Sequence, residues 1–184
     1  MISSDNSSRA DNQQVTEEKI SNEYLCGFVD GEGCFYVGFG KRTDLPLKWQ
    51  IITEFHLSQN PGGKNVLETF IKRLGCGYLK PNHPGSLKDK TWVLIVKDRK
   101  DIKNKLIPFF LEHPLQTIKR LEFLIFKQVI EVIENKQHLN ENGFRRIVEL
   151  VFSLPRSTNK RYSKDKLLRH LRDYMPDPTM AGKI

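Results

Sequence analysis

The most informative segment of this 184-residue chain is Tyr24-Leu25-Cys26-Gly27-Phe28-Val29-Asp30-Gly31-Glu32-Gly33-Cys34-Phe35. It predicts a short apolar helix that ends at glycine and continues directly into an aromatic strand. Gly27 and Gly31 share one helix face, where each costs up to about 1 kcal/mol relative to alanine. Glu32 lies in the last turn, where the helix dipole disfavours a negative charge by roughly 0.3–1 kcal/mol. Such local losses are typical of sites where another backbone approaches closely or a cation binds.

The part of this segment from Leu25 to Gly33 resembles the motif that names the LAGLIDADG homing endonucleases. Cys26 stands at the usual alanine and Glu32 at the last acidic position. The resemblance covers roughly residues 20–155, because further features follow in the same order: the aromatic strand, Phe55-His56-Leu57-Ser58-Gln59, Leu74-Gly75-Cys76-Gly77-Tyr78, and Lys119 before a long helix. It implies a site-specific double-strand DNA endonuclease, encoded within an intron, that hydrolyses phosphodiester bonds in a long pseudo-palindromic target.

The hydrophobic pattern independently predicts an α+β domain. Alternating apolar and polar residues indicate strands at 35–40, 47–59, 78–80 and 91–97, and helical periodicity indicates helices at 66–74, 98–110, 117–137 and 141–153. We therefore expect four antiparallel strands with helices on one face, and the resemblance implies that these form an αββαββα core followed by extra C-terminal helices. In the first helix, the residues expected to face the core are Tyr24, Leu25, Phe28 and Val29. In the longest helix they are Leu121, Leu124, Ile125, Ile130 and Ile133.

Composition divides the chain into three parts. Residues 1–18 are polar without an apolar period and predict a disordered lead, residues 19–154 form the endonuclease domain, and residues 155–184 form a basic extension. Within the extension, 155–159 reads as a linker and Lys164 to Tyr174 as a short basic helix. Its cations either bind DNA phosphates or lie on a helix that is solvated and frayed.

Charge, cysteine content and hydropathy limit the class of protein. The formal net charge of +8 favours a polyanionic partner. Cys26, Cys34 and Cys76 form no CxxC pair, which indicates free thiols in a reducing compartment and argues against a disulfide framework or a zinc site. No segment is apolar enough to span a membrane, so we expect a soluble, non-secreted protein in the compartment of the intron host, an organelle (chloroplast or mitochondrion) or the bacterial cytoplasm.

One face of the predicted sheet lacks helices and carries a mixture of donors and acceptors. Such a mixture suits the reading of base edges in a major groove, although a solvated half of an antiparallel sheet looks similar. The resemblance favours double-stranded DNA as the partner. The candidate DNA-binding residues are Tyr36, Lys41, Arg42, Lys48, Gln50, Glu54, His56, Tyr78, Lys80, Asn82, Thr91 and Lys97.

The candidate metal ligand is Glu32, which the resemblance places at the metal-binding acid, together with the main-chain carbonyl of Gly31. Hard oxygen ligands of this kind select Mg²⁺ or Mn²⁺ over zinc. Asp30 points about 200° away from Glu32 on a helix, so we expect it to make a structural hydrogen bond or salt bridge. Without the resemblance, Glu32 would read as a surface acid.

Two further catalytic residues follow from the resemblance alone. Gln59 matches the position that orients the attacking water, and Lys119 matches the lysine that stabilises charge around the site. From the residues themselves, Gln59 equally fits a strand-end hydrogen bond and Lys119 a surface cation at a helix N-terminus.

Only one copy of the motif is present, and one acid cannot cut two strands. We therefore expect a homodimer in which two motif helices cross, which in turn predicts a pseudo-palindromic target. The interface candidates are Cys26, Gly27, Asp30 and Gly31.

Two other functions use the same pattern. One is an intron RNA maturase that assists splicing without cutting, and the other is a DNA-binding regulator. Retention of Glu32, Gln59 and Lys119 favours the nuclease, because neither of the other proteins needs the metal-binding acid.

Overall fold

The computed structural model describes residues 20–154 and 161–172, so the predicted lead 1–18 and the predicted linker lie outside the described residues. The predicted αββαββα order is confirmed by α1 (Asn22–Glu32), β1 (Gly33–Lys41), β2 (Trp49–Gln59), α2 (Lys64–Leu74), β3 (Tyr78–Pro81), β4 (Trp92–Val96) and α5 (Ile118–Glu134). The helices α6 (Glu141–Phe152) and α7 (Lys164–Arg172) follow. Short elements are η2 (Pro61–Gly63), α3 (Arg99–Asp101), η3 (Ile102–Leu106), α4 (Ile107–Glu112) and η4 (Gln137–Leu139).

The four strands form one antiparallel sheet in the order β1-β2-β4-β3. The register aligns Cys34, His56, Ile95 and Tyr78 in one row across the sheet. Along β2, the residues from Trp49 to Leu57 alternate between buried and half-buried. This alternation confirms that one face packs and the other stays accessible.

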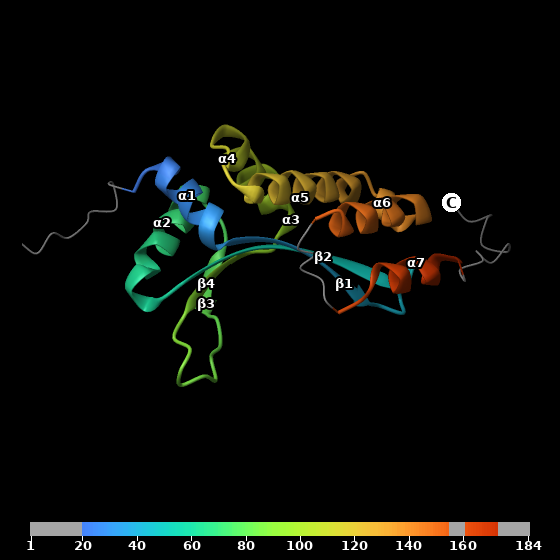
Figure 1. Cartoon of the computed structure of the whole chain (residues 1–184), viewed down its shortest axis with the longest axis horizontal. Helices are drawn as coiled ribbons and strands as arrows, with labels where there is room; N and C mark the ends of the chain where they lie inside the picture. The colour runs from blue at the N-terminus through green and yellow to red at the C-terminus, as the bar shows by residue number, and fades with distance from the viewer. Residues whose placement is uncertain (1–19, 155–160, 173–184) are drawn as a thin grey trace, which may run out of the picture.

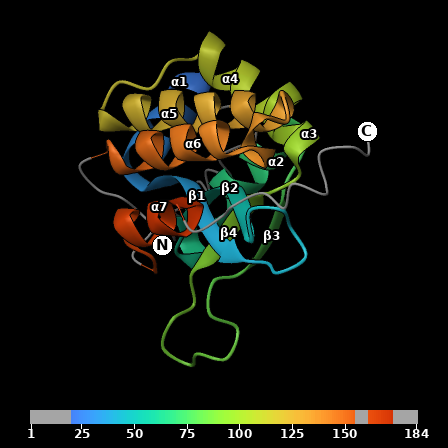
Figure 2. The same ribbon diagram turned by 90° about the vertical axis from the view of Figure 1, so that its right-hand side faces the viewer.

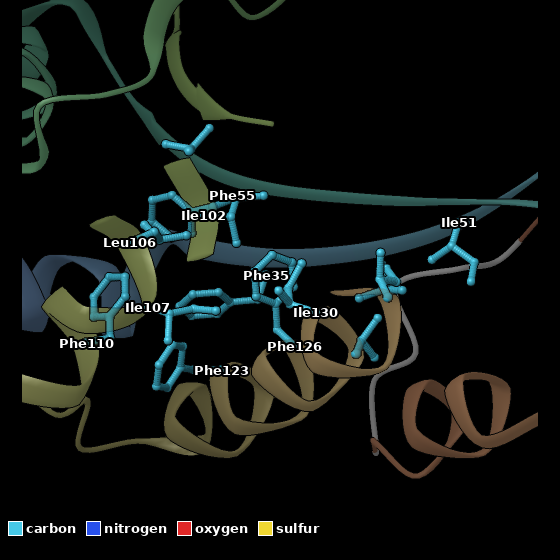
Figure 3. Close-up of a cluster of buried hydrophobic side chains, with 14 of the residues drawn as sticks. Phe35, Ile51, Phe55, Ile102, Leu106, Ile107, Phe110, Phe123, Phe126 and Ile130 are labelled. Atoms are coloured by element: carbon cyan, nitrogen blue, oxygen red, sulfur yellow. The ribbon is translucent and has the colours of Figure 1, made fainter. Parts of the chain in front are cut away.

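The helices α1, α2, α5 and α6 lie on one side of the sheet, whereas the loop between β3 and β4 extends away from them (Figures 1 and 2). An aromatic cluster fills the space between the sheet and the helices (Figure 3). Its centre is Phe35, whose ring lies 5.2–5.6 Å from the rings of Phe55, Phe110, Phe123 and Phe126. Burying each such side chain contributes roughly 1.5–3 kcal/mol, so this cluster fixes α5 over β1.

A corner without a loop joins α1 to β1. Ser21 caps the start of α1 by accepting a hydrogen bond from the Tyr24 N–H, and α1 ends at Glu32. At Gly33 a Cβ atom would lie 2.6 Å from Val29 Cγ1 and 2.7 Å from the Val29 carbonyl oxygen. Only glycine fits this corner, which therefore holds Glu32 at the junction of helix and strand.

The helical segment before α5 is continuous from α3 through η3 to α4. Asp98 caps it by accepting hydrogen bonds from the N–H groups of Lys100 and Asp101 at 2.9 and 3.0 Å. The segment ends at His113, directly before Pro114. The segment begins where the sequence predicts and continues two residues beyond the predicted end at 110, to Glu112. Its end brings residues 113–117 against α1. Among the described residues, no helix has the length and apolar character needed to cross a membrane.

Three residues predicted to lie in the core are exposed instead. Tyr24 is 55% exposed, Leu121 45% and Leu124 39%. Each of these helices packs on one side only, and the side that packs is displaced by about one residue from the predicted stripe. The buried residues of α1 and α5 instead include Cys26, Phe123 and Phe126.

Candidate active site and nucleic-acid interface

Glu32 is the last residue of α1 and is exposed. The final carbonyl groups of a helix lack intrahelical partners, and the last turn of α1 carries no basic residue. The carboxylate therefore lies beside the negative end of the helix dipole, an arrangement that attracts a cation.

Asp30 makes the structural hydrogen bonds expected of it. Its carboxylate accepts from the N–H of Gln116 at 2.8 Å, from the N–H of Thr117 at 3.1 Å and from the Thr117 hydroxyl at 2.8 Å. Thr117 itself caps α5 by accepting from the Lys119 N–H. The carboxylate thus binds the start of α5 to the end of α1.

Lys119 follows from this connection, two residues into α5. Its Nζ lies 2.8 Å from Glu122 Oε2, and the two side chains are only 19% and 14% exposed. The charges of both act on Cys34, whose pKa is raised mainly by burial, lowered by Lys119 and raised by Glu122. Because Cys34 is two residues beyond Glu32, the structure brings Lys119 to the α1–β1 corner. Sequence reasoning missed Glu122, which the i,i+3 spacing from Lys119 could have indicated.

Gln59 ends β2 near the same corner, because Gly33 pairs with Leu57 in the adjoining strand. Its Oε1 accepts a hydrogen bond from the Asn60 N–H at 2.7 Å, which is the strand-end hydrogen bond that the sequence left open. The Gln59 side chain also packs against η2, since a Cβ atom at Gly63 would lie 2.5 Å from Gln59 Cγ. Among the described residues, the side-chain amide Nε2 of Gln59 makes no hydrogen bond, so this group remains available near the corner.

The oxygen ligands available at the corner fit a hard divalent cation. Glu32 supplies an accessible carboxylate and the helix end supplies carbonyl oxygens. Within the described residues no three His, Cys, Asp or Glu side chains gather in a way that could hold a metal. Mg²⁺ commonly takes only one or two carboxylates and fills its shell with water and substrate phosphate, which suits this sparse set.

The uncovered face of the sheet carries a polar network near its middle. The rings of Tyr36 and His56 stack with centroids 6.2 Å apart, and His56 Nε2 lies 2.8 Å from Glu54 Oε2. Burial, followed by the charge of Glu54, raises the pKa of Tyr36. These three candidate DNA-binding residues are thus held in fixed orientations beside one another.

Two loops continue this face at its ends. In the β1–β2 loop, Arg42 donates two hydrogen bonds to Asp44 at 2.8 and 2.7 Å, which hold the pKa of that carboxyl at about 2. Lys48 Nζ donates to the Thr43 carbonyl in the same loop. In the β3–β4 loop, the Asp89 carboxylate accepts from Thr91 and contacts His83, and the hydrogen bonds from Thr91 are the main reason that its pKa is about 2.

The Asn82 N–H donates to the Thr91 carbonyl at the base of the β3–β4 loop. Gln50 lies half-buried in β2, opposite Gly40. The structure therefore places most of the predicted interface residues on the uncovered face or in its two flanking loops. Lys41 is an exception, because this last residue of β1 pairs with Trp49 of the packed face.

The cations of the uncovered face differ from those of the helices. On the helical side, Lys103, Lys105, Lys127 and Arg145 each pair with an acid at 2.5–2.8 Å. Across the described residues, Lys41, Lys80 and Lys97 have no acidic partner, and Lys97 Nζ lies 5.5 Å from the centre of the Tyr78 ring. Lys80 and Lys97 therefore leave positive charge uncompensated on the sheet side, which favours an anionic partner.

The outer face of α1 is left open. A Cβ atom added at Gly27 or Gly31 would meet nothing within 4 Å, so packing within this chain does not require either glycine. Cys26 was expected on this face, but it is only 6% exposed and its thiol donates to the His113 carbonyl at 3.2 Å. Tyr24, Gly27 and Gly31 form the open face, next to a hollow of about 290 Å³ lined by Glu23, Cys26, Gly27, Asp30 and residues 112–114 and 116.

A helix that ends in an acid, beside a sheet with an uncovered polar face, is typical of α+β proteins that bind nucleic acid. The family model of LAGLIDADG endonucleases matches residues 25–130. The homing endonuclease I-TnaI has a similar structure, with a TM-score of 0.70 and 31% identity over 83% of this chain and 96% of that chain. The chain belongs to the LAGLIDADG endonuclease family.

Two other comparisons agree with this assignment. I-LtrWI bound to target DNA aligns with a TM-score of 0.67 and 34% identity over 72% of this chain and 44% of that chain. Probable intron-encoded endonuclease 2 of Neurospora crassa is 28% identical over 132 residues, which are 72% of this chain and 27% of that protein. The chain spans about a quarter of the length of this relative and of two others, at 27%, 23% and 25%.

Proposed function

We propose that this chain is a site-specific DNA endonuclease that acts as a homodimer with Mg²⁺ or Mn²⁺. The observation that carries the proposal is the exposed carboxylate of Glu32, held at a loop-free corner beside an uncovered, positively charged sheet. I-TnaI is a homing endonuclease and I-LtrWI was crystallised with its target DNA, which supports the same substrate here.

The reaction is hydrolysis of a phosphodiester bond. A water oxygen forms a bond to phosphorus, the bond from phosphorus to the 3′ oxygen breaks, and the proton lost by the water balances the one taken up by the leaving oxygen. Glu32 and the Gly31 carbonyl would hold the divalent cation, which would supply Lewis-acid stabilisation of the attacked phosphate. Gln59 orients the water through its side-chain amide, and Lys119 stabilises the developing negative charge.

Two copies are needed because each supplies one Glu32. The open face of α1 lets a second α1 approach at Gly27 and Gly31, which brings the two carboxylates near a twofold axis. Each uncovered sheet then reads one half of a pseudo-palindromic site in the major groove. The target is the intron-insertion site in DNA that lacks the intron.

The test is a cleavage screen with Mg²⁺ on a library that contains randomised sequences and intron-insertion sites. Wild type should cut, and Glu32→Gln should bind the selected DNA without cutting it. The matched control is Glu131→Gln, an exposed acid in the second half of α5, which should cut like wild type. Equal cutting by wild type and Glu32→Gln would refute the assignment, and RNA binding with no DNA cleavage by wild type would favour the maturase.

A further inference from the structure

The basic helix α7 is folded against the domain and is not a solvated tail. Leu167 is fully buried in the common core, and Lys164 Nζ lies 2.5 Å from Glu149 of α6. The Tyr162 ring packs edge-on against Trp49 of β2, with centroids 4.8 Å apart. Three contacts to three different parts of the domain therefore fix the position of α7.

That position is beside the edge strand β1. In Figures 1 and 2, α7 lies below α6, level with the β1–β2 part of the sheet. Arg161, just before α7, is close enough to Tyr36 on the uncovered face for its charge to act on the Tyr36 hydroxyl. Since β3 is the opposite edge of the sheet, α7 and the β3–β4 loop lie at opposite edges of the sheet.

The outward side of α7 carries positive charge. Lys166 and Arg169 are exposed and three residues apart, so they share one helix face. Lys166 Nζ and the Arg161 guanidinium lie 5.5 and 5.6 Å from the centre of the Tyr162 ring, which extends the cationic surface toward β1. Among the residues that the structure describes, neither Lys166 nor Arg169 pairs with an acid, unlike Lys119 and Lys127 of α5 and Arg145 of α6.

We propose that α7 is a second DNA-contact element, in which Lys166 and Arg169 bind the sugar–phosphate backbone next to the half-site that the sheet reads. The inference rests on the proposed function, because it takes the uncovered face as the DNA-binding face. Phosphate contacts carry no sequence information and position the protein on the duplex. The α7 cations therefore contribute affinity and register, whereas the sheet contributes specificity.

The experiment compares Lys166→Gln/Arg169→Gln with wild type as full-length protein on a duplex of random sequence. Each phosphate contact contributes about 0.9 to the slope of log K against log salt, so the double variant should lower the slope by roughly 1.8 per protomer. Affinity at 0.15 M salt should fall about tenfold to thirtyfold per protomer, with the difference disappearing toward 1 M salt. The single variants should each lose about half of this slope change.

The matched control is Lys100→Gln/Arg146→Gln, which removes the same charge from exposed positions in α3 and α6. It should keep the wild-type slope, and thermal unfolding should show that both double variants remain folded. A wild-type slope in Lys166→Gln/Arg169→Gln would overturn the role of α7 while leaving the endonuclease intact. An equal loss in both double variants would also overturn it, because only net charge would then matter. If wild type binds no DNA at all, the proposed function itself fails.

Discussion

The Asp30 carboxylate and Thr117 are joined by two hydrogen bonds across 87 residues of sequence, one to the Thr117 hydroxyl at 2.8 Å and one to its N–H at 3.1 Å. Asp30 precedes Glu32 by two residues in α1, and Thr117 precedes Lys119 by two residues at the start of α5. This pair of residues therefore sets the distance between the proposed metal ligand and the proposed catalytic lysine.

Asp30→Ala should destabilise the fold and reduce cleavage together. It removes the acceptor for three donors at the start of α5, and losses of this kind cost about 1–2 kcal/mol. Urea unfolding followed by circular dichroism measures the change in free energy. Asp30→Asn keeps one acceptor oxygen, so its free energy of unfolding should lie between those of wild type and Asp30→Ala. Thr117→Ser keeps the hydroxyl and should resemble wild type. An Asp30→Ala protein with wild-type stability would show that the hydrogen bonds contribute nothing.

We expect Glu122 to position Lys119 for catalysis. The two side chains are largely buried and only 2.8 Å apart, so removing either charge leaves the other without its partner in a poorly solvated place. Lys119→Met should abolish cleavage, and Glu122→Gln should lower kcat about tenfold with little change in DNA affinity. Single-turnover cleavage and binding by fluorescence anisotropy separate the two effects. Glu131→Gln, which affects an exposed acid of the same helix, is the control. A Glu122→Gln variant with unchanged kcat would show that Lys119 needs no such support.

The sequence predicts the local elements well because they depend on short-range patterns. The glycine at the end of α1 and the alternation along β2 are each visible within a few residues, and the structure confirms them. Partners that lie far apart in the chain are not visible in this way. Nothing near Asp30 indicates that its carboxylate meets Thr117, and nothing in the basic tail indicates that Leu167 enters the core.

Periodicity also locates a helix face only to within about one residue. Leu121 and Leu124 satisfy the apolar period of α5, yet the aromatic cluster selects Phe123 and Phe126 as the inward residues because these rings meet Phe35. Tyr24 is exposed for a similar reason, since α1 packs through Leu25, Cys26 and Val29. Single-sequence patterns therefore give the existence of each helix more reliably than its orientation.

The three thiols should react very slowly in the folded protein. Burial raises the pKa of Cys26 and of Cys76 to about 11, and burial also raises the pKa of Cys34. A pKa of about 11 instead of the ordinary 9.0 reduces the thiolate fraction at pH 8 roughly 100-fold. The thiolate is the reactive form. Labelling with a disulfide reagent at pH 8 should be slow in buffer and complete in urea. Rapid labelling of Cys26 or Cys76 without urea would contradict the buried placement.

The same shifts predict how stability depends on pH. The folded chain holds these thiol protons more tightly than the unfolded chain, whose thiols ionise near their ordinary value of 9.0. Stability from Cys26 and Cys76 is therefore fully present below pH 9 and is lost as the pH rises from about 9 toward about 11. Cys26→Ser/Cys76→Ser lacks this titration, so its free energy of unfolding should decline less steeply over that range.

Alanine at Gly27 and Gly31 should have opposite effects on the single chain and on the homodimer. Within one chain a Cβ atom at either position meets nothing within 4 Å, and replacing a helical glycine by alanine gains roughly 0.5–1 kcal/mol of helix stability. Between two chains the same methyl groups separate crossing helices that rely on close backbone approach. Gly27→Ala/Gly31→Ala should therefore raise the free energy of unfolding of the monomer while weakening dimerisation and cleavage.

Gel filtration with light scattering measures the dimer, since wild type should show about twice the 21.4 kDa chain mass. Gly62→Ala is the matched control, because its Cβ also meets nothing within 4 Å but the residue lies in η2, away from α1. The control should leave both mass and cleavage unchanged. A Gly27→Ala/Gly31→Ala protein that still dimerises and cuts like wild type would exclude the crossing of the two α1 helices at these glycines, and with it the meeting of two Glu32 carboxylates at a twofold axis.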